Sequence, residues 1–224
     1  MDGTVPSAVR TLEVRRLGTV AYPDALALQA DLVTQRRSEE IPDQLLLLQH
    51  PHVITLGASS DTAHVLADAG ERARLGIELH EVGRGGDVTY HGPGQLVGYP
   101  ILDLKPDRKD LHRYLRDLEA VLIDALEALG VDGAGRREGL TGVWLPTGKV
   151  AAIGVRVSSG WITSHGFALN VAPDLAYFRT IVPCGIDNER VTSVSDALGR
   201  GIDVAEVEDV VVAAFARRFG RVAR

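Results

Sequence analysis

Apolar and polar positions along the chain predict several amphipathic helices. Apolar residues recur at helical spacing over 22–37, 110–129 and 204–219. The stripe over 110–129 is the clearest and consists of Leu111, Leu115, Leu118, Leu122, Leu126 and Leu129. Gly130 is expected to end that helix. A further helix over 61–75, capped by Asp61 or Thr62, and a short helical turn at 195–198 complete the helical segments.

Other segments are apolar throughout or alternate with a period of two, which predicts strands. These segments are 10–17, 44–49, 52–56, 77–82, 95–104, 142–145, 150–158 and 164–171. Four consecutive leucines between Pro42 and Pro51 indicate a buried strand. Strands cluster with hairpin-like turns, and helices are inserted between the groups. This order predicts an α+β fold with a mixed, largely antiparallel central sheet flanked by helices.

Length and composition favour a single globular domain over residues 1–224, in which residues 1–9 form an N-terminal extension. Apolar residues make up 45% of the 224 residues, enough for a sizeable core. The net charge of -6 and the pI near 5.6 do not favour nucleic acid as a partner. No apolar run approaches the roughly 20 residues of a membrane span, and residues 1–16 lack the apolar block of a secretory signal. We therefore expect a cytoplasmic protein.

Residues 84–95 form a glycine-rich loop with the sequence RGGDVTYHGPGQ. Its four glycines and one proline exclude a helix and allow the main chain to approach a ligand closely. The loop matches neither the phosphate-binding GxxxxGK[ST] pattern nor a dinucleotide-binding turn, because a strand rather than a helix follows Gly94. A plain turn is the alternative. Arg84, Tyr90 and His91 within the loop favour ligand contact.

Cys184 is the only cysteine of the chain, so it cannot form an intramolecular disulfide. Pro183 and Gly185 place it on a constrained turn, where its sulfur can face a cavity. A single thiol in an intracellular enzyme is a candidate nucleophile when a neighbouring group promotes its ionisation. The alternative is a buried cysteine that acts as a small apolar residue.

Lys149 opens a predicted strand and is a candidate for that neighbouring group. A cysteine thiol has a pKa of about 8.5, and a nearby ammonium lowers this pKa by stabilising the thiolate. A solvated position at the end of the strand is the alternative. Small residues at Gly154, Gly166 and Ala168 would leave space beside the sheet for an elongated apolar ligand, or would permit close packing. The scattered histidines show no metal-binding spacing, so we expect no metal.

Taken together, these segments resemble the lipoyl(octanoyl) transferase family. The matching stretches are RGGDVTYHGPGQLVGYPI (84–101), GVWLPTGKVAAIGVR (142–156), SHGFALNV (164–171) and VPCGI (182–186). The resemblance implies the fold of the biotin and lipoate protein ligases, with a smaller second sheet. It also implies transfer of an octanoyl group from acyl carrier protein to a lysine of lipoyl domains. The acceptors would be 2-oxo acid dehydrogenase complexes and the glycine cleavage H protein. The enzyme would act as a monomer, without a cofactor, nucleic acid or membrane.

The same resemblance assigns roles to individual residues. Cys184 corresponds to the family's acyl-thioester nucleophile, and Lys149 to the residue that lowers the pKa of its thiol. The substrate-contact segments of the family correspond to Arg84, Gly85, Gly86, Asp87, Val88, Thr89, Tyr90, His91, Ala152, Ile153, Gly154, Gly166, Phe167 and Ala168. His165 is a possible supporting residue, which together with His91 would orient the reacting groups.

Three other functions stay open. An ATP-dependent lipoate or biotin ligase on the same fold would activate a free acid and would need no cysteine. A non-catalytic lipoyl-domain binding protein would keep its role without Cys184. A thioesterase would transfer the acyl group to water. Activity with octanoyl-acyl carrier protein in the absence of ATP separates the transferase from the ligase.

Overall fold

A computed structural model describes residues 10–106, 108–182 and 190–224 of the chain. The predicted N-terminal extension, residues 1–9, therefore lies outside the described residues. The larger of two sheets has seven strands in the order β10-β1-β2-β6-β9-β8-β7, and the smaller has three in the order β4-β3-β5. The larger sheet contains β1 (Arg10–Thr19), β2 (Asp43–Gln49), β6 (Gln95–Ile101), β7 (Val143–Leu145), β8 (Gly148–Val157), β9 (Thr163–Asn170) and β10 (Arg221–Ala223). The smaller sheet contains β3 (Val53–Leu56), β4 (Glu78–Glu81) and β5 (Val88–His91).

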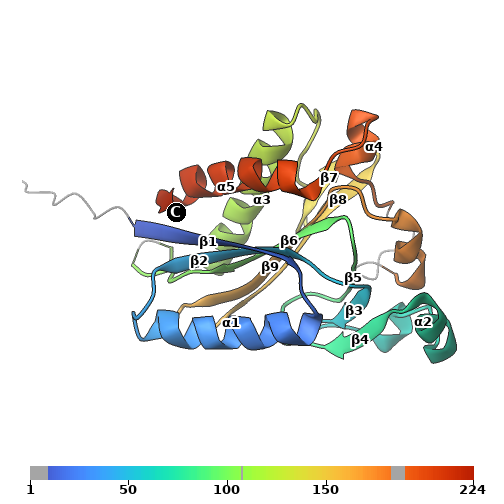
Figure 1. The fold of residues 1–224 in the computed structure, drawn as a ribbon, viewed down its shortest axis with the longest axis horizontal. Helices are drawn as coiled ribbons and strands as arrows, with labels where there is room; N and C mark the ends of the chain where they lie inside the picture. Colours follow the sequence, from blue (N-terminus) through green and yellow to red (C-terminus); the bar gives the residue numbers. More distant parts are fainter. Residues whose placement is uncertain (1–9, 107, 183–189) are drawn as a thin grey trace, which may run out of the picture.

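In the larger sheet β1 runs parallel to β2 and β10, and the other neighbouring strands are antiparallel. This arrangement confirms the predicted mixed, largely antiparallel sheet and the smaller second sheet. The helices are α1 (Tyr22–Arg37), α2 (Ala69–Leu75), α3 (Leu111–Ala128), α4 (Val194–Leu198) and α5 (Val204–Phe219), with 3-10 turns η1 (Thr62–His64) and η2 (Leu175–Thr180). Figure 1 shows α1 on one face of the larger sheet and α3 with α5 on the other. Among the described helices, none is long and apolar enough to cross a bilayer.

Strand β2 explains why four leucines stand in a row. Leu45 and Leu47 belong to the core beneath α3 and α5, whereas Leu46 and Leu48 belong to the core beneath α1. Successive side chains of a strand point to opposite faces, so a central strand covered on both faces is apolar throughout. Burial of each leucine contributes about 2 kcal/mol. The predicted buried strand is confirmed, and the structure shows that it is covered on both faces.

The predicted helix over 61–75 is wrong in its middle. Asp61 accepts a hydrogen bond from the Ala63 N–H at the start of η1, and Asp68 accepts one from the Glu71 N–H at the start of α2. Between these two caps, Val65 pairs with Ile181 in an isolated antiparallel bridge. The main chain there is therefore satisfied by a distant segment, and this tertiary pairing prevents a continuous helix.

Three short elements were not predicted. Strand β5 lies within the glycine-rich loop and exists because it pairs with β3, where Thr55 faces Thr89 and Ile54 faces Tyr90. Strand β10 has three residues and pairs with β1. The 3-10 turn η2 begins at Asp174, whose carboxylate accepts a hydrogen bond from the Ala176 N–H. None of these segments is long enough to show a period of its own.

Candidate active site

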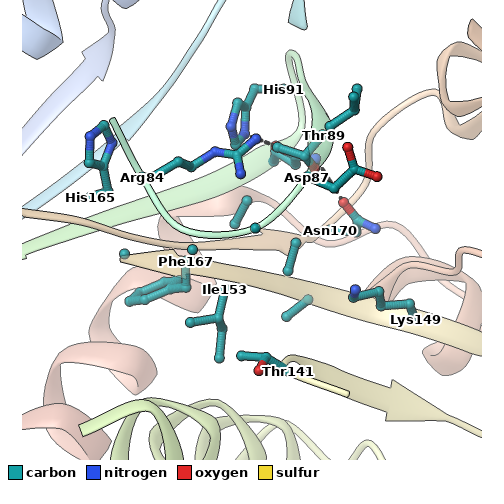
Figure 2. Close-up of a pocket in the computed structure, with 18 of the residues that line it drawn as sticks. Arg84, Asp87, Thr89, His91, Thr141, Lys149, Ile153, His165, Phe167 and Asn170 are labelled. Atoms are coloured by element: carbon teal, nitrogen blue, oxygen red, sulfur yellow. Dashed lines mark hydrogen bonds between the residues drawn. The ribbon is translucent and has the colours of Figure 1, made fainter. Parts of the chain in front are cut away.

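A pocket lies where the loop before β5 covers strands β8 and β9 of the larger sheet (Figure 2). The space within it is about 810 Å³, which includes open solvent at its mouth. Most residues predicted to contact substrate or to catalyse line this pocket, although they come from three separate stretches of sequence. They are Arg84, Gly85, Gly86, Asp87, Val88, Thr89, His91, Lys149, Ala152, Ile153, Gly154, His165, Gly166, Phe167 and Ala168. Cys184 lies outside the described residues.

The loop from Arg84 to Asp87 rests directly on β8. The Gly85 N–H donates to the Val155 carbonyl over 2.9 Å, and a Cβ at Gly154 would lie 3.0 Å from the Gly85 carbonyl oxygen. Gly86 has a φ of +90°, a conformation that other residues rarely adopt. Glycine at 154 therefore lets the loop approach the strand, and glycine at 86 lets the loop turn.

Arg84 joins this loop to the smaller sheet. Its side chain is buried, and its guanidinium donates to both the carbonyl and the Oγ1 of Thr55 on β3, each over 2.8 Å. A third hydrogen bond, of 3.1 Å, reaches the Gly85 carbonyl. A buried guanidinium with several acceptors fixes the loop in one geometry. Figure 2 shows Arg84 between His165 and His91.

Of the two roles expected for Gly166, space beside the sheet or close packing, the structure favours close packing, although the residue also lines the pocket. A Cβ at this position would lie 2.1 Å from the Gly98 carbonyl oxygen and 2.6 Å from Pro100 Cδ, both on the neighbouring strand β6. Close packing of β9 on β6 therefore requires glycine at 166. The pocket wall is formed by the small side chains of Ala152 and Ala168, which are cross-strand partners on β8 and β9.

Lys149 reaches the pocket next to an irregularity in β8. Val143 pairs with Ala151 and Trp144 pairs with Lys149, so Val150 has no partner on β7. This is the arrangement of a β-bulge, which interrupts the alternation of side chains along a strand. Val150 and Ala151 both belong to the core beneath α3. Lys149 is only 6% exposed, and its Nζ lies 4.9 Å from the centroid of the Trp144 ring. The cation–π contact compensates part of the cost of burying the amine.

The chain next to the Cys184 segment is attached to this lysine. The Lys149 N–H donates to the Arg190 carbonyl over 2.8 Å, and the Thr192 N–H donates to the Lys149 carbonyl over 3.0 Å. Val191, between them, lines the pocket. On the other side of the segment, the Val182 N–H donates to the His64 carbonyl over 2.8 Å. His64 in turn forms a 2.6 Å contact with Asp87, which lines the pocket.

Tyr90 is the predicted contact residue that does not line the pocket. Side chains alternate along β5, so Thr89 and His91 face the pocket while Tyr90 points to the core of the smaller sheet. There its hydroxyl lies 2.7 Å from the Nδ1 of His52, and its ring packs edge-on against Phe178. Tyr90 is thus the one predicted contact between 84 and 91 that does not line the pocket, although Val88 on the same face of β5 does.

The two predicted histidines are neutral at pH 7. The pKa of His91 is lowered to about 3, mainly by burial and to a smaller extent by His50 and Arg84. Burial likewise lowers the pKa of His165 to about 4, with Arg84 and Arg156 adding to the effect. The site thus offers uncharged imidazoles beside apolar walls. Such a pocket can hold an uncharged, elongated group next to an amine.

Sequence reasoning missed several lining residues: Tyr22, Gln95, Tyr99, Thr141, Ala151, Asn170, Phe178 and Val191. Gln95, Tyr99 and Asn170 lie within the stretches that resemble the transferase family, so their motif context could have indicated them. Tyr22 lies at the start of α1, far from any motif, and only the fold brings it to the pocket. Among the described residues, no group of three or more His, Cys, Asp or Glu side chains could hold a metal ion.

Known proteins resemble this chain over most of its length. Residues 21–216 match the family described as the lipoyl protein ligase A/B catalytic domain. The octanoyltransferase of Rubrobacter xylanophilus is 53% identical over 211 residues, which cover 93% of this chain and 94% of that protein. The octanoyltransferase of Solibacter usitatus is 49% identical, with 94% of each chain covered.

The fold is also found in a solved structure of a related class. The crystal structure of a lipoate-protein ligase A bound with ATP superposes with a TM-score of 0.78 at 18% identity, over 96% of this chain and 87% of the ligase. This likeness confirms the expected fold. A family match over most of the chain, together with about half of the residues identical to named enzymes, shows that the chain belongs to the lipoyl protein ligase A/B catalytic family, and within it to the octanoyltransferases.

Proposed function

We propose that this protein transfers an octanoyl group from octanoyl-acyl carrier protein to a lysine of lipoyl domains. The acceptors would include the lipoyl domains of 2-oxo acid dehydrogenase complexes and the glycine cleavage H protein. Family membership supports the reaction class. The observation that carries the proposed mechanism is the position of Lys149, whose buried amine lies in the pocket. The main chain of Lys149 is hydrogen-bonded to the residues on either side of Val191, which closely follows Cys184 in sequence.

In the first step, the Cys184 thiolate attacks the thioester carbonyl of the donor. A tetrahedral oxyanion forms, the carbon–sulfur bond to the carrier breaks, and the carrier leaves as a thiolate that takes up the proton of the Lys149 ammonium, which leaves Lys149 neutral. The ammonium of Lys149 stabilises the Cys184 thiolate and so increases the fraction of the thiol that can react. One thioester replaces another in this step, so it requires no ATP and no cofactor.

In the second step, the neutral amine of the acceptor lysine attacks the acyl-enzyme. The new amide forms, the Cys184 thiolate leaves, and Lys149 in its neutral form accepts the proton that the amine loses. Main-chain N–H groups are the candidate donors to the oxyanion. The apolar walls at Ala152 and Ala168 hold the acyl chain while both steps take place.

The first prediction concerns these two residues. After mixing with octanoyl-acyl carrier protein without ATP, the native enzyme should gain the mass of one octanoyl group at Cys184, and Cys184→Ser should gain none. The Lys149→Ala variant should be acylated at least about tenfold more slowly, because a smaller fraction of the Cys184 thiol is ionised at pH 7 without the neighbouring ammonium. Intact mass spectrometry with time measures both effects.

A matched control is Lys109→Ala, since Lys109 also lies over a tryptophan ring, 5.6 Å from the centroid of Trp161, but is exposed. It should acylate like the native enzyme. Octanoyl transfer by Cys184→Ser at the native rate would refute covalent catalysis. A requirement for ATP and free octanoate would assign the protein to the ligases instead.

A further inference from the structure

A chain of side-chain hydrogen bonds connects His91 to the main chain beside Lys149. The Asn170 Nδ2 donates to the Thr192 carbonyl over 3.0 Å. The Gln95 Nε2 donates to the Asn170 Oδ1 over 3.0 Å and to the Tyr90 carbonyl over 3.1 Å. The Gln95 Oε1 lies 3.0 Å from the Nδ1 of His91. The Thr192 N–H, at the far end, donates to the Lys149 carbonyl.

The Thr192 carbonyl at one end fixes the donor and the acceptor of every hydrogen bond in this series. A carbonyl only accepts, so the Asn170 amide must present Nδ2 to Thr192 and its Oδ1 to Gln95. Both hydrogens of Gln95 Nε2 are then used, on Asn170 and on the Tyr90 carbonyl, and its Oε1 is left to accept. His91 must therefore donate from Nδ1. A neutral imidazole carries one hydrogen, so its Nε2 bears a lone pair.

The bare Nε2 belongs to a ring that lines the pocket. Within the described part of the chain, the only hydrogen bond of the His91 side chain is the one at Nδ1. The Nε2 atom is not one of the fully buried polar atoms that have no hydrogen-bond partner. The chain of bonds also determines where this acceptor lies. Gln95 and Asn170 are cross-strand partners on β6 and β9, and Thr192 follows Val191, another pocket residue. His91 is thus connected to the end of the pocket that holds Lys149.

We propose that Gln95 and Asn170 are positioning residues that hold His91 in its Nδ1–H tautomer, so that the His91 Nε2 accepts a hydrogen bond from the amine of the acceptor lysine. The inference rests on the proposed function. There Cys184 reacts as a thiolate and carries no hydrogen, and Lys149 serves the thiolate and then accepts a proton, so the acceptor amine is the N–H donor left for Nε2 to hold. One of its hydrogens bonds to Nε2 and is not transferred, and the bond turns the nitrogen lone pair toward the thioester. A ring that protonates only in acid is suited to accepting a hydrogen bond rather than to removing a proton.

The competing interpretation is that His91 only donates to Gln95 and has a structural role. Two variants separate these roles, because the amide of asparagine occupies the position of Nδ1 and the amide of glutamine reaches the position of Nε2. His91→Asn can keep the bond to Gln95 and loses the acceptor in the pocket. His91→Gln can restore an acceptor there. The aminolysis rate is measured by mixing purified acyl-enzyme with a lipoyl domain, and the acylation rate is measured separately.

We expect His91→Asn to slow aminolysis about tenfold to a hundredfold, the usual effect of losing one hydrogen bond to a polar reacting group, and to slow acylation much less. His91→Gln should recover most of the aminolysis rate. Native aminolysis by His91→Asn, or an equal loss in both half-reactions, would overturn the proposal. Failure of the native enzyme to form any acyl-enzyme would instead refute the proposed function, so the two failures are distinguishable.

A spectroscopic measurement tests the tautomer in the native protein and does not depend on how a variant folds. The ¹⁵N chemical shifts of histidine-labelled protein distinguish a protonated ring nitrogen from a bare one. We expect Nδ1 of His91 to be protonated and Nε2 to be bare at pH 7, and Asn170→Ala to produce a mixture of tautomers. A proton on Nε2 in the native protein would overturn the proposal.

Discussion

Small side chains give the pocket its room at the residue scale. Ala152 and Ala168 face each other across β8 and β9, and both line the pocket. The glycines beside them have a different purpose, since added Cβ atoms at Gly154 and Gly166 would meet the main chain of neighbouring segments. A change at an alanine therefore alters the space available to a ligand, whereas a change at a glycine disturbs the packing of the sheet.

The residue-scale prediction is that Ala152→Leu shortens the acyl chain that the enzyme accepts. The three added carbons would enter the pocket, because Ala152 is partly exposed to it. Transfer of an octanoyl group should fall at least about tenfold while transfer of a butanoyl group falls less, since an overfilled cavity costs roughly 1–3 kcal/mol. Acyl-enzyme formation with the two donors measures the ratio. Ala128→Leu, on the exposed end of α3, is the control, and an unchanged ratio in Ala152→Leu would contradict the acyl slot.

Residues of this site were predictable where a motif contains them and where a side chain's direction follows from its strand. Lys149, Arg84 and Ala168 stand in contiguous motifs, and they line the pocket. Tyr90 stands in the same motif and points away, because the strand β5 that sets its direction depends on pairing with β3. Tyr22 could not be predicted, since α1 approaches the pocket only through packing on the larger sheet.

At the scale of elements, α3 holds the loop that borders Lys149. Glu119 is fully buried on α3 and accepts hydrogen bonds from Arg116, from Arg136 and from the Gly142 N–H. Gly142 lies against the lysine, since a Cβ added there would be 2.9 Å from the Lys149 Cε. A carboxylate on a helix therefore positions the wall against which the amine packs.

The element-scale prediction is that Glu119→Gln loosens this wall. An amide is uncharged and cannot accept from both guanidinium groups as the carboxylate does, so the free energy of unfolding should fall by about 1–3 kcal/mol. Acylation of Cys184 should also slow, because Lys149 loses a packed neighbour. Urea denaturation and the acylation rate measure the two effects. Glu127→Gln, at an exposed site on the same helix, should change neither, and an effect of equal size there would contradict the role of Glu119.

Element boundaries show which signals the sequence carries. Helix α1 spans Tyr22–Arg37 as predicted, with its proline in the first turn as the local signal, although the face that it buries consists of Tyr22, Ala25, Gln29 and Leu32. The helix over 61–75 was wrong, because its helical spacing is local, whereas the pairing of Val65 with Ile181 joins segments far apart in the sequence. Strand β10 consists of three residues and is stabilised by β1, so no pattern within it could have predicted it.

On the scale of the whole molecule, Asp43 ties distant parts of the chain together. It is 1% exposed at the start of β2, and its carboxylate forms ion pairs with Arg10 on β1, Arg36 on α1 and Arg221 on β10. Its Oδ1 also accepts from the Asp103 N–H. One carboxylate thus connects both ends of the described chain with the first helix.

The prediction at this scale is that Asp43→Ala destabilises the protein by about 3–5 kcal/mol, since it leaves the nearly buried guanidinium of Arg221 without its carboxylate. Urea denaturation followed by circular dichroism gives the free energy of unfolding. The control is Asp124→Ala, because the pair of Asp124 with Arg217 is exposed and should cost less than about 1 kcal/mol. Equal losses in the two variants would show that Asp43 has no special role.

The unpaired Val150 of β8 also limits how this enzyme can be recombined with its relatives. Lys149 and Ala152 both line the pocket although they are three residues apart, and they share one side of β8 only because the bulge interrupts the alternation of its side chains. A chimera that sets β8 against a partner strand without this bulge would turn the amine of Lys149 to the face of Ala151, into the hydrocarbon layer under α3. Exchange between homologues therefore has to keep β7 and β8 together.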